Sequence, residues 1–141
     1  MDNKFLLSLL RKYNDEPTKA NKIKVTISDW SKLDLKYALM IMVFEGKMQA
    51  VRLLIDEYNV EALENYQGRN IIHCAVSSGN IELLDYIRNR KEYSQIDINA
   101  TFSSIHNEPC GTALDLAPQG SDMYHHLISM GARTLLQISG R

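Results

Sequence analysis

The sequence predicts an all-α fold: a solenoid of stacked helix–turn–helix units with hairpin-like loops and an N-terminal capping helix. The first observation is that apolar residues recur at helical spacing on both sides of Gly46 and again on both sides of Gly79. The second is that these glycines are 33 residues apart, a period typical of stacked repeats. The third is that each predicted helix is too short to be stable alone in water, so the units must pack together.

Residues 67–87 show the repeating unit most clearly. Asn70 can begin a helix by accepting a backbone N–H, and Gly79 can end it because glycine tolerates a left-handed backbone. The apolar positions of this helix and of the helix that follows are Ile71, Ile72, Ala75 and Val76, then Ile81, Leu83, Leu84 and Ile87.

The same order of events surrounds Gly46. An apolar helix is predicted from Leu35 to Phe44, and a return helix begins at Met48. At the offset of 33 residues, the apolar positions of the two return helices correspond: Val51 to Leu84, and Leu54 to Ile87.

A third, irregular copy follows. Residues 111–117 mirror the helix start at residues 69–76. Pro118 is expected to end this helix early, because proline cannot continue a helix. A return helix then ends at Gly131.

These copies give the predicted organisation of the chain. Residues 1–34 form an N-terminal helical cap and linker, residues 35–133 form the repeats, and residues 134–141 form a C-terminal tail. The repeats divide at about 35–64, 65–98 and 99–133. Within the cap, residues 2–14 are amphipathic, with the stripe Phe5, Leu6, Leu9, Leu10 and Tyr13, and residues 14–27 are an irregular connection.

Two segments depart from the regular spacing. Residues 88–95 are an insertion that either lengthens the second helix of the central unit or adds a loop. The connection from Asn99 to Thr112 is longer than a standard hairpin and contains Phe102 and Ile105. Long loops tend to carry function, although both apolar side chains could simply pack onto the helices.

Composition and charge exclude several classes of function. Apolar residues make up 45% and charged residues 23% of the chain, and the net charge of −1 gives no general attraction to nucleic acid or membranes. The charge is uneven: residues 1–25 hold six basic and three acidic residues, whereas residues 92–132 hold five acidic and no basic ones. These regions are either ordinary solvated surface or two distinct docking faces.

The chain contains no stretch long enough to be a predicted membrane span and no signal-peptide cleavage pattern after its short N-terminal apolar run. Two cysteines are too few for a disulfide scaffold, so we expect a reducing compartment, the cytoplasm.

No constellation of residues predicts catalysis or metal binding. His125 and His126 are adjacent on a predicted helix and therefore point about 100° apart. His106 and Cys110 are four residues apart, but no second pair with zinc-finger spacing follows. We predict no catalytic residue, no metal and no cofactor; an enzyme that uses a Cys–His pair is the minor alternative.

The repeat resembles the ankyrin repeat. The helix-opening motif of that family is recognisable in Asn70-Ile71-Ile72-His73-Cys74-Ala75 and in Thr112-Ala113-Leu114-Asp115-Leu116-Ala117, and residues 79–84 resemble its inter-helix turn. The resemblance covers about residues 35–133, with a degraded first copy. In this family, a histidine at the position of His73 bonds the helix-opening side chain and the backbone of a neighbouring hairpin, so the resemblance implies a structural role for it.

The resemblance also implies where a partner protein would bind, namely a concave face lined by hairpin tips and inner helices. The partner-binding residues expected by position are Phe44, Glu45, Tyr66, Gln67, Arg69, Ser77, Ser78, Phe102, Ser104, Ile105 and His106. The residues expected to be structural are Gly46, Asn70, His73, Gly79, Thr112 and Gly131.

The expected function is therefore a non-enzymatic protein–protein interaction module, with no nucleic acid, no membrane insertion and no small-molecule substrate. Short arrays of this kind resemble inhibitor-type and pathogen-encoded host-interaction proteins, and the usage of Ile, Asn and Lys favours an AT-rich genome. Such a protein would act in the host cytoplasm. The alternative is a two-site adaptor in which residues 5–13 dock a second protein.

Overall fold

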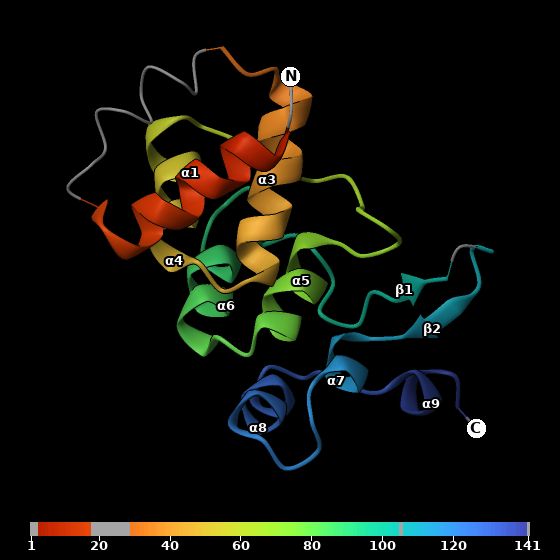
Figure 1. Ribbon diagram of the computed structural model, residues 1–141. Helices are drawn as coiled ribbons and strands as arrows, with labels where there is room; N and C mark the ends of the chain where they lie inside the picture. The colour runs from red at the N-terminus through yellow and green to blue at the C-terminus, as the bar shows by residue number, and fades with distance from the viewer. Residues whose placement is uncertain (1–2, 18–28, 105, 141) are drawn as a thin grey trace. The chain divides into compact units, whose positions relative to one another are not determined.

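The computed structural model describes residues 3–17, 29–104 and 106–140 (Figure 1). Most of the predicted connection at 14–27, and Ile105 among the expected binding residues, therefore lie outside the described residues. The chain divides into two compact units, residues 1–62 and residues 63–141, and each is described by itself.

The first unit is built from helices α1 (Asn3–Asp15), α3 (Lys32–Phe44) and α4 (Met48–Arg52), and α4 continues into a π-helical turn, η2 (Leu53–Glu57). Helix α3 begins at Lys32 rather than at the expected Leu35, because the Ser31 side chain accepts the backbone N–H of Asp34 and caps the helix. Gly46 has a positive φ of 72° in the turn between α3 and α4. Val51 and Leu54, which the repeat spacing matches to Leu84 and Ile87, are both fully buried.

Helix α1 is part of the core of this unit. It packs against α3 and α4, and Leu6 and Leu10 are buried. The Asn14 side-chain oxygen accepts the backbone N–H groups of Gln49 and Ala50, at 2.9 and 3.2 Å, and so caps the start of α4. Phe5, a member of the predicted apolar stripe, is 58% exposed.

The second unit contains two helix pairs and a short hairpin. The first pair is α5 (Ile71–Ser78) and α6 (Ile81–Arg88), and the second is α7 (Ala113–Leu116) and α8 (Asp122–Ser129). Between them lies the antiparallel pair β1 (Phe102–Ser103) and β2 (Pro109–Gly111), and α9 (Leu135–Ile138) follows α8. Helix α5 packs against both α6 and α7, and the core includes Leu83, Leu84, Ile87 and Leu127.

Helix α7 ends early, as expected from Pro118. Ala117 has an extended backbone with ψ of 132°, the conformation that a following proline favours. The insertion at 88–95 adds a loop: α6 ends at Arg88, and the next residues form turns. Tyr93 is buried in this loop, and the Arg88 guanidinium donates to the Ile96 carbonyl at 2.5 Å.

Candidate functional site

The turn before α5 is a two-residue hairpin. The Tyr66 N–H donates to the Arg69 carbonyl at 2.8 Å, and the Arg69 N–H donates back to the Tyr66 carbonyl at 3.0 Å. Gln67 and Gly68, the two residues between them, have positive φ angles of 51° and 79°. This geometry belongs to the tight turns that suit hairpins, and it places a strained non-glycine residue, Gln67, at the tip.

The tip packs directly against the next hairpin. The Ser103 N–H of β1 donates to the Gly68 carbonyl at 3.0 Å. A Cβ added to Gly68 would lie 2.2 Å from the Ser103 carbonyl oxygen, so no other residue fits without movement. Within the second hairpin Phe102 pairs with Gly111 and Ser103 pairs with Pro109, with an irregular register between the two pairs.

Three side chains meet where the two hairpins lie against α5. The Arg69 guanidinium carbon lies over the Phe102 ring, 5.2 Å from its centroid, as a cation–π contact. The Phe102 and His73 rings meet edge to face, with centroids 5.6 Å apart at an interplanar angle of 75°. Arg69 and Phe102 are half-buried, whereas His73 is buried.

Every polar atom of the His73 ring has a structural partner. Nδ1 accepts the Asn70 N–H at 3.1 Å, and the Asn70 side-chain oxygen accepts the His73 N–H at 2.9 Å. Because Nδ1 is an acceptor, the ring proton is on Nε2, which donates to the Ala100 carbonyl at 2.8 Å. Burial lowers the pKa of His73, the bond to Ala100 opposes this, and the charge of Arg69 lowers the pKa further. The ring is therefore a neutral clamp between helix and hairpin.

The start of α7 has a related arrangement. The Thr112 N–H donates to the Asp115 carboxylate at 2.9 Å, and the Thr112 hydroxyl donates to the Arg133 carbonyl. The same Asp115 oxygen accepts the Leu135 N–H at 2.8 Å. Gly131, just before this segment, has a φ of 85°.

The remaining predicted residues of this unit differ in how much of them is accessible. Ser77 is half-buried, and the Ser78 hydroxyl is used inside the turn, donating to Ala75 at 2.6 Å and accepting the Asn80 N–H at 3.1 Å. In the second hairpin, the Ser104 hydroxyl accepts the N–H of His106, whose side chain is exposed.

Phe44 and Glu45 belong to the first unit. Phe44 is 47% exposed. Both carboxylate oxygens of Glu45 accept hydrogen bonds from the Arg11 guanidinium, at 2.8 and 2.6 Å. These bonds hold the pKa of Glu45 below its ordinary value against the opposing effect of burial. Glu45 is therefore engaged within its own unit.

The titratable groups offer little for catalysis. Burial raises the pKa of the Cys74 thiol to about 11, although the charge of Arg69 acts in the opposite direction, so the thiolate nucleophile does not form near neutral pH. Cys110 is exposed, and its thiol lies 3.5 Å from the Glu108 carbonyl. Within the described ranges, no three His, Cys, Asp or Glu side chains gather as metal ligands would.

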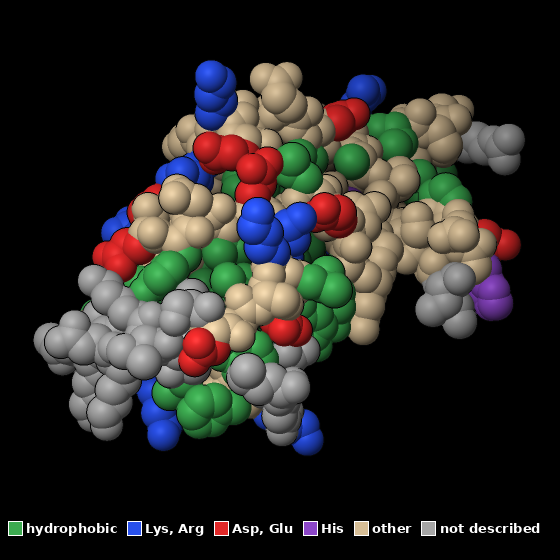
Figure 2. Space-filling view, turned by 90° about the horizontal axis from the view of Figure 1, so that it is seen from above, with side chains coloured by type: hydrophobic (Ala, Val, Ile, Leu, Met, Phe, Trp, Pro, Cys, Tyr) green, Lys and Arg blue, Asp and Glu red, His purple; other side chains and the backbone are tan. Residues whose placement is uncertain are grey.

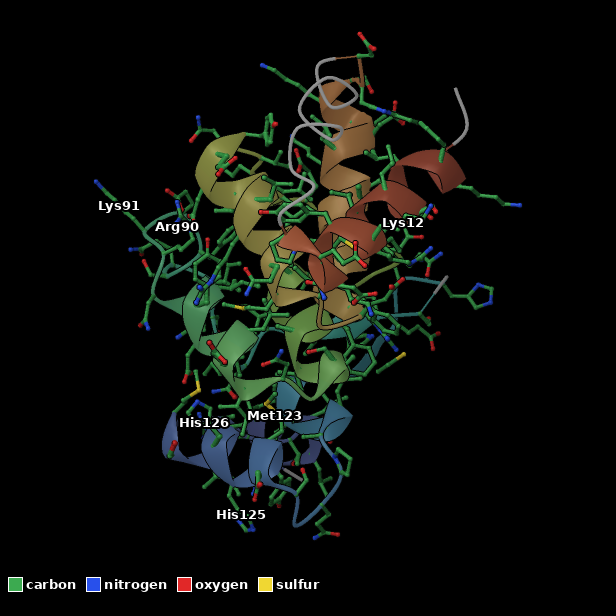
Figure 3. All side chains as sticks on the ribbon, turned by 60° about the vertical axis from the view of Figure 1, so that its left-hand side comes forward. Lys12, Arg90, Lys91, Met123, His125 and His126 are labelled. Atoms are coloured by element: carbon green, nitrogen blue, oxygen red, sulfur yellow. The ribbon has the colours of Figure 1, made fainter. Side chains whose placement is uncertain are left out.

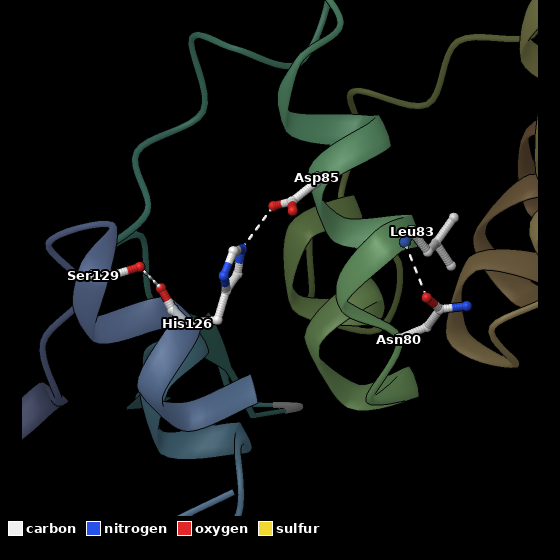
Figure 4. Close-up of polar contacts among 5 residues, drawn as sticks. All are labelled: Asn80, Leu83, Asp85, His126 and Ser129. Atoms are coloured by element: carbon white, nitrogen blue, oxygen red, sulfur yellow. Dashed lines mark hydrogen bonds and ion pairs between the residues drawn. The ribbon is translucent and has the colours of Figure 1, made fainter. Parts of the chain in front are cut away.

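The two adjacent histidines of α8 point in different directions, as Figure 3 shows. His126 faces α6, where its Nε2 lies 2.7 Å from the Asp85 carboxylate (Figure 4). His125 is exposed. No sequence pattern signals this pair, because its members are 41 residues apart. The Arg69–Phe102 contact and the Arg11–Glu45 ion pair also have no sequence signal, because their members are far apart along the chain.

Across the face drawn in Figure 2, Lys and Arg side chains stand among Asp and Glu side chains, and the described side chains form no continuous basic surface there. Along the described helices, none combines the length and apolar character needed to cross a membrane.

Comparison with known proteins gives one match. The family model described as ankyrin repeats, with three copies, matches residues 4–101, more than half of the chain. The match begins within α1 and ends just before β1. Searches of curated proteins and of solved structures found no match. The helix–turn–helix pairs, the glycine turns and this match lead to the same conclusion, which confirms the predicted fold class: the chain belongs to the ankyrin repeat family.

Proposed function

We propose that this protein is a non-enzymatic module that binds a partner protein through one surface of its second unit. We call this the tip surface and define it as Tyr66, Gln67, Arg69, Phe102, Ser104 and His106. Ankyrin repeats are generally protein–protein interaction modules. The observation that carries the proposal is the Arg69–Phe102 stack beside a rigid two-residue turn. Arginine and tyrosine are frequent binding hot spots, and residues already held in place lose less entropy on binding.

The other predicted residues contribute less in this proposal. The Glu45 carboxylate is bound to Arg11, and the Ser78 hydroxyl is bound within its turn. A partner would have to displace these bonds to use either group. Phe44, in the first unit, and Ser77, in the second, remain secondary positions.

We propose that α1 is a cap rather than the docking helix of a two-site adaptor. Its Leu6 and Leu10 side chains are buried, and its Asn14 side chain caps α4. Deleting residues 1–14 should therefore unfold the first unit, measured as lost helical circular dichroism. A deletion variant that stays folded and loses one binding partner would favour the adaptor instead.

We further propose that α7 and α8 form an irregular repeat beyond the matched residues.

The location and origin of the protein are also proposals. Two free cysteines are compatible with the cytoplasm, and the residue usage noted above favours a pathogen-encoded protein acting in a host cell. Immunofluorescence of the expressed chain in a cultured cell tests the first point.

The binding proposal is tested by affinity capture with quantitative mass spectrometry, in which the Tyr66→Ala, Arg69→Ala double variant is compared with the native chain. The matched control is Asp122→Ala, His125→Ala, a pair of exposed side chains on α8. We expect the partner signal to fall about tenfold or more with the tip variant, the loss that a hot spot gives, and to persist with the control. Equal capture by the tip variant and the native chain would show that binding occurs elsewhere.

A further inference from the structure

We infer that the tip surface recognises one carboxylate side chain of its partner, set among uncharged residues, and that the Arg69 guanidinium is the group that binds it. This inference rests on the proposed function and adds the chemistry of the ligand.

Arg69 is an isolated cation in this part of the chain. It is the only Lys or Arg in residues 63–87, and residues 92–132 contain none. Five acidic residues lie within 92–132, yet among the described residues no ion pair joins Arg69 to a carboxylate. Its backbone N–H bonds Tyr66, but its guanidinium N–H groups have no acceptor within the described chain. A half-buried guanidinium with five unused donors favours an external acceptor.

The guanidinium is held in place by a series of contacts leading into the core. Phe102 lies beneath it, and the buried His73 ring meets the Phe102 ring edge to face. A Cβ at Gly111 would lie 2.9 Å from the Phe102 ring, so the glycine makes room for that ring. His73 itself is fixed by Asn70 and Ala100. Because the arginine is positioned before the ligand arrives, less conformational entropy is lost on binding.

The charge of the surroundings selects the ligand. A planar guanidinium matches a carboxylate or a phosphate through two parallel hydrogen bonds. Nucleic acids bind through several cations at once, whereas Arg69 is the only Lys or Arg of residues 63–87, and the neighbouring hairpin carries Glu108. A single carboxylate pairs with Arg69, whereas further negative charges would be repelled. The ligand is therefore a segment with one Asp or Glu flanked by uncharged residues.

The test uses a phage-displayed library of random twelve-residue peptides, selected separately on the native chain and on Arg69→Met, Arg69→Glu and Tyr66→Ala variants. His125→Ala is the control. Peptides selected by the native chain should carry one Asp or Glu at a common position. Arg69→Met keeps an apolar stem of similar reach, and circular dichroism confirms its fold. It should weaken these peptides about 10- to 100-fold, the range for a charge-assisted hydrogen bond. Arg69→Glu should select Lys or Arg instead.

Phe102 is a positioning residue in this scheme. Phe102→Leu should weaken the acidic peptides several-fold, and Phe102→Tyr should restore their affinity, because tyrosine retains the aromatic face. A purely structural effect would weaken acidic and neutral peptides equally.

The outcomes separate the two proposals. If peptides lose affinity with Tyr66→Ala but show no acidic preference, or resist Arg69→Met, the carboxylate inference is wrong and the tip surface stands. If peptides bind but ignore Tyr66→Ala, or if no peptide is selected, both proposals fail. Tighter Arg69-dependent binding of labelled single-stranded DNA than of any peptide would also overturn the inference, because it would identify a polyanion as the ligand.

Discussion

Helices α5 and α7 begin with the same geometry and different chemistry. At α5, Asn70 and His73 cap each other, and His73 also bonds the carbonyl of Ala100, beyond the return helix α6. At α7, the Thr112 N–H bonds the Asp115 carboxylate, and the Thr112 hydroxyl bonds the carbonyl of Arg133, beyond the return helix α8. In both helix pairs, hydrogen bonds join the start of the first helix to the segment that follows the second helix.

Helices this short need a hydrogen bond that joins their first turn to the chain beyond the return helix. Helix α5 has eight residues and α7 has four, lengths at which an isolated helix is unstable. The two solutions differ in exposure: His73 is buried and must stay neutral, whereas Asp115 is exposed to solvent. The start of α5 should therefore be the more sensitive of the two, to substitution and to acid.

The largest expected effect is at His73. Replacing His73 with alanine removes the acceptor for the buried Asn70 N–H and the donor for the half-buried Ala100 carbonyl, leaving both groups without these partners. We expect a loss of about 3 kcal/mol in the free energy of unfolding, measured by urea denaturation. His125→Ala, at an exposed position, should change it by less than about 0.5 kcal/mol. Equal losses in the two variants would contradict the clamp.

The next largest effect is expected at the turn before α5, whose tip contacts the hairpin that precedes α7. Gly68→Ala should destabilise the protein by about 2 kcal/mol or more, because the added Cβ meets Ser103 and the φ is positive. Gly79→Ala has the same backbone problem and no steric clash, so it should lose only about 1 kcal/mol. If the two variants melt at the same temperature, the contact between hairpins contributes nothing.

A smaller loss is expected at Thr112. Thr112→Val keeps the shape of the side chain and removes the hydroxyl that bonds Arg133, which should lower stability by about 1.5 kcal/mol. Thr112→Ser retains the hydroxyl and should therefore keep most of the stability of the native chain. A valine variant as stable as the native chain would show that the bond from Thr112 to Arg133 does not stabilise the start of α7.

The pH dependence of stability provides a separate comparison. Folding lowers the pKa of His73 from 6.5, so the unfolded chain takes up the proton first. The stabilisation is complete above the unfolded pKa and is lost as the pH falls below it, toward the folded pKa. Urea titrations between pH 7.5 and about 5 should show a loss that is smaller in His73→Gln than in the native chain and unchanged in His125→Gln. A native-like slope in His73→Gln would assign the loss to another group.

The smallest effect is expected between the return helices α6 and α8. The His126 and Asp85 side chains are 29% and 45% exposed, so solvent screens the interaction between them. A double-mutant cycle with Asp85→Asn and His126→Gln should give a coupling below about 1 kcal/mol, reduced further by added salt. A larger coupling would mean that the pair, and not the caps alone, holds the two helix pairs together.

Part of this architecture could be predicted because its signals are local. Spacing in the sequence matched Val51 with Leu84 and Leu54 with Ile87, and all four are fully buried. Gly46 and Gly79 occupy left-handed turns, as their positions between apolar helices indicate. The spacing predicts the insertion at 88–95 but not its form; in the structure α6 ends at Arg88 and the insertion is a loop in which Tyr93 is buried.

The candidate site was predictable only in part. Position in the repeat placed Tyr66, Gln67 and Arg69 at a hairpin tip. Position could not show that the Glu45 carboxylate is occupied by Arg11, 34 residues away. It also could not show which members of the apolar stripe are buried: Leu6 and Leu10 are, whereas Phe5 is exposed.

The family, the repeat period and the main turns follow from the amino-acid sequence alone. These features follow from hydrophobic periodicity and from glycine and proline backbone preferences, which act over a few residues. Which side chains are engaged and which remain available depends on the three-dimensional packing. The stacking of Arg69 on Phe102, the clamp from His73 to Ala100 and the pairing of Asp85 with His126 join residues 27 to 41 positions apart. Such contacts depend on how the helix pairs pack, because the energy of a polar side chain is set by its neighbours in space.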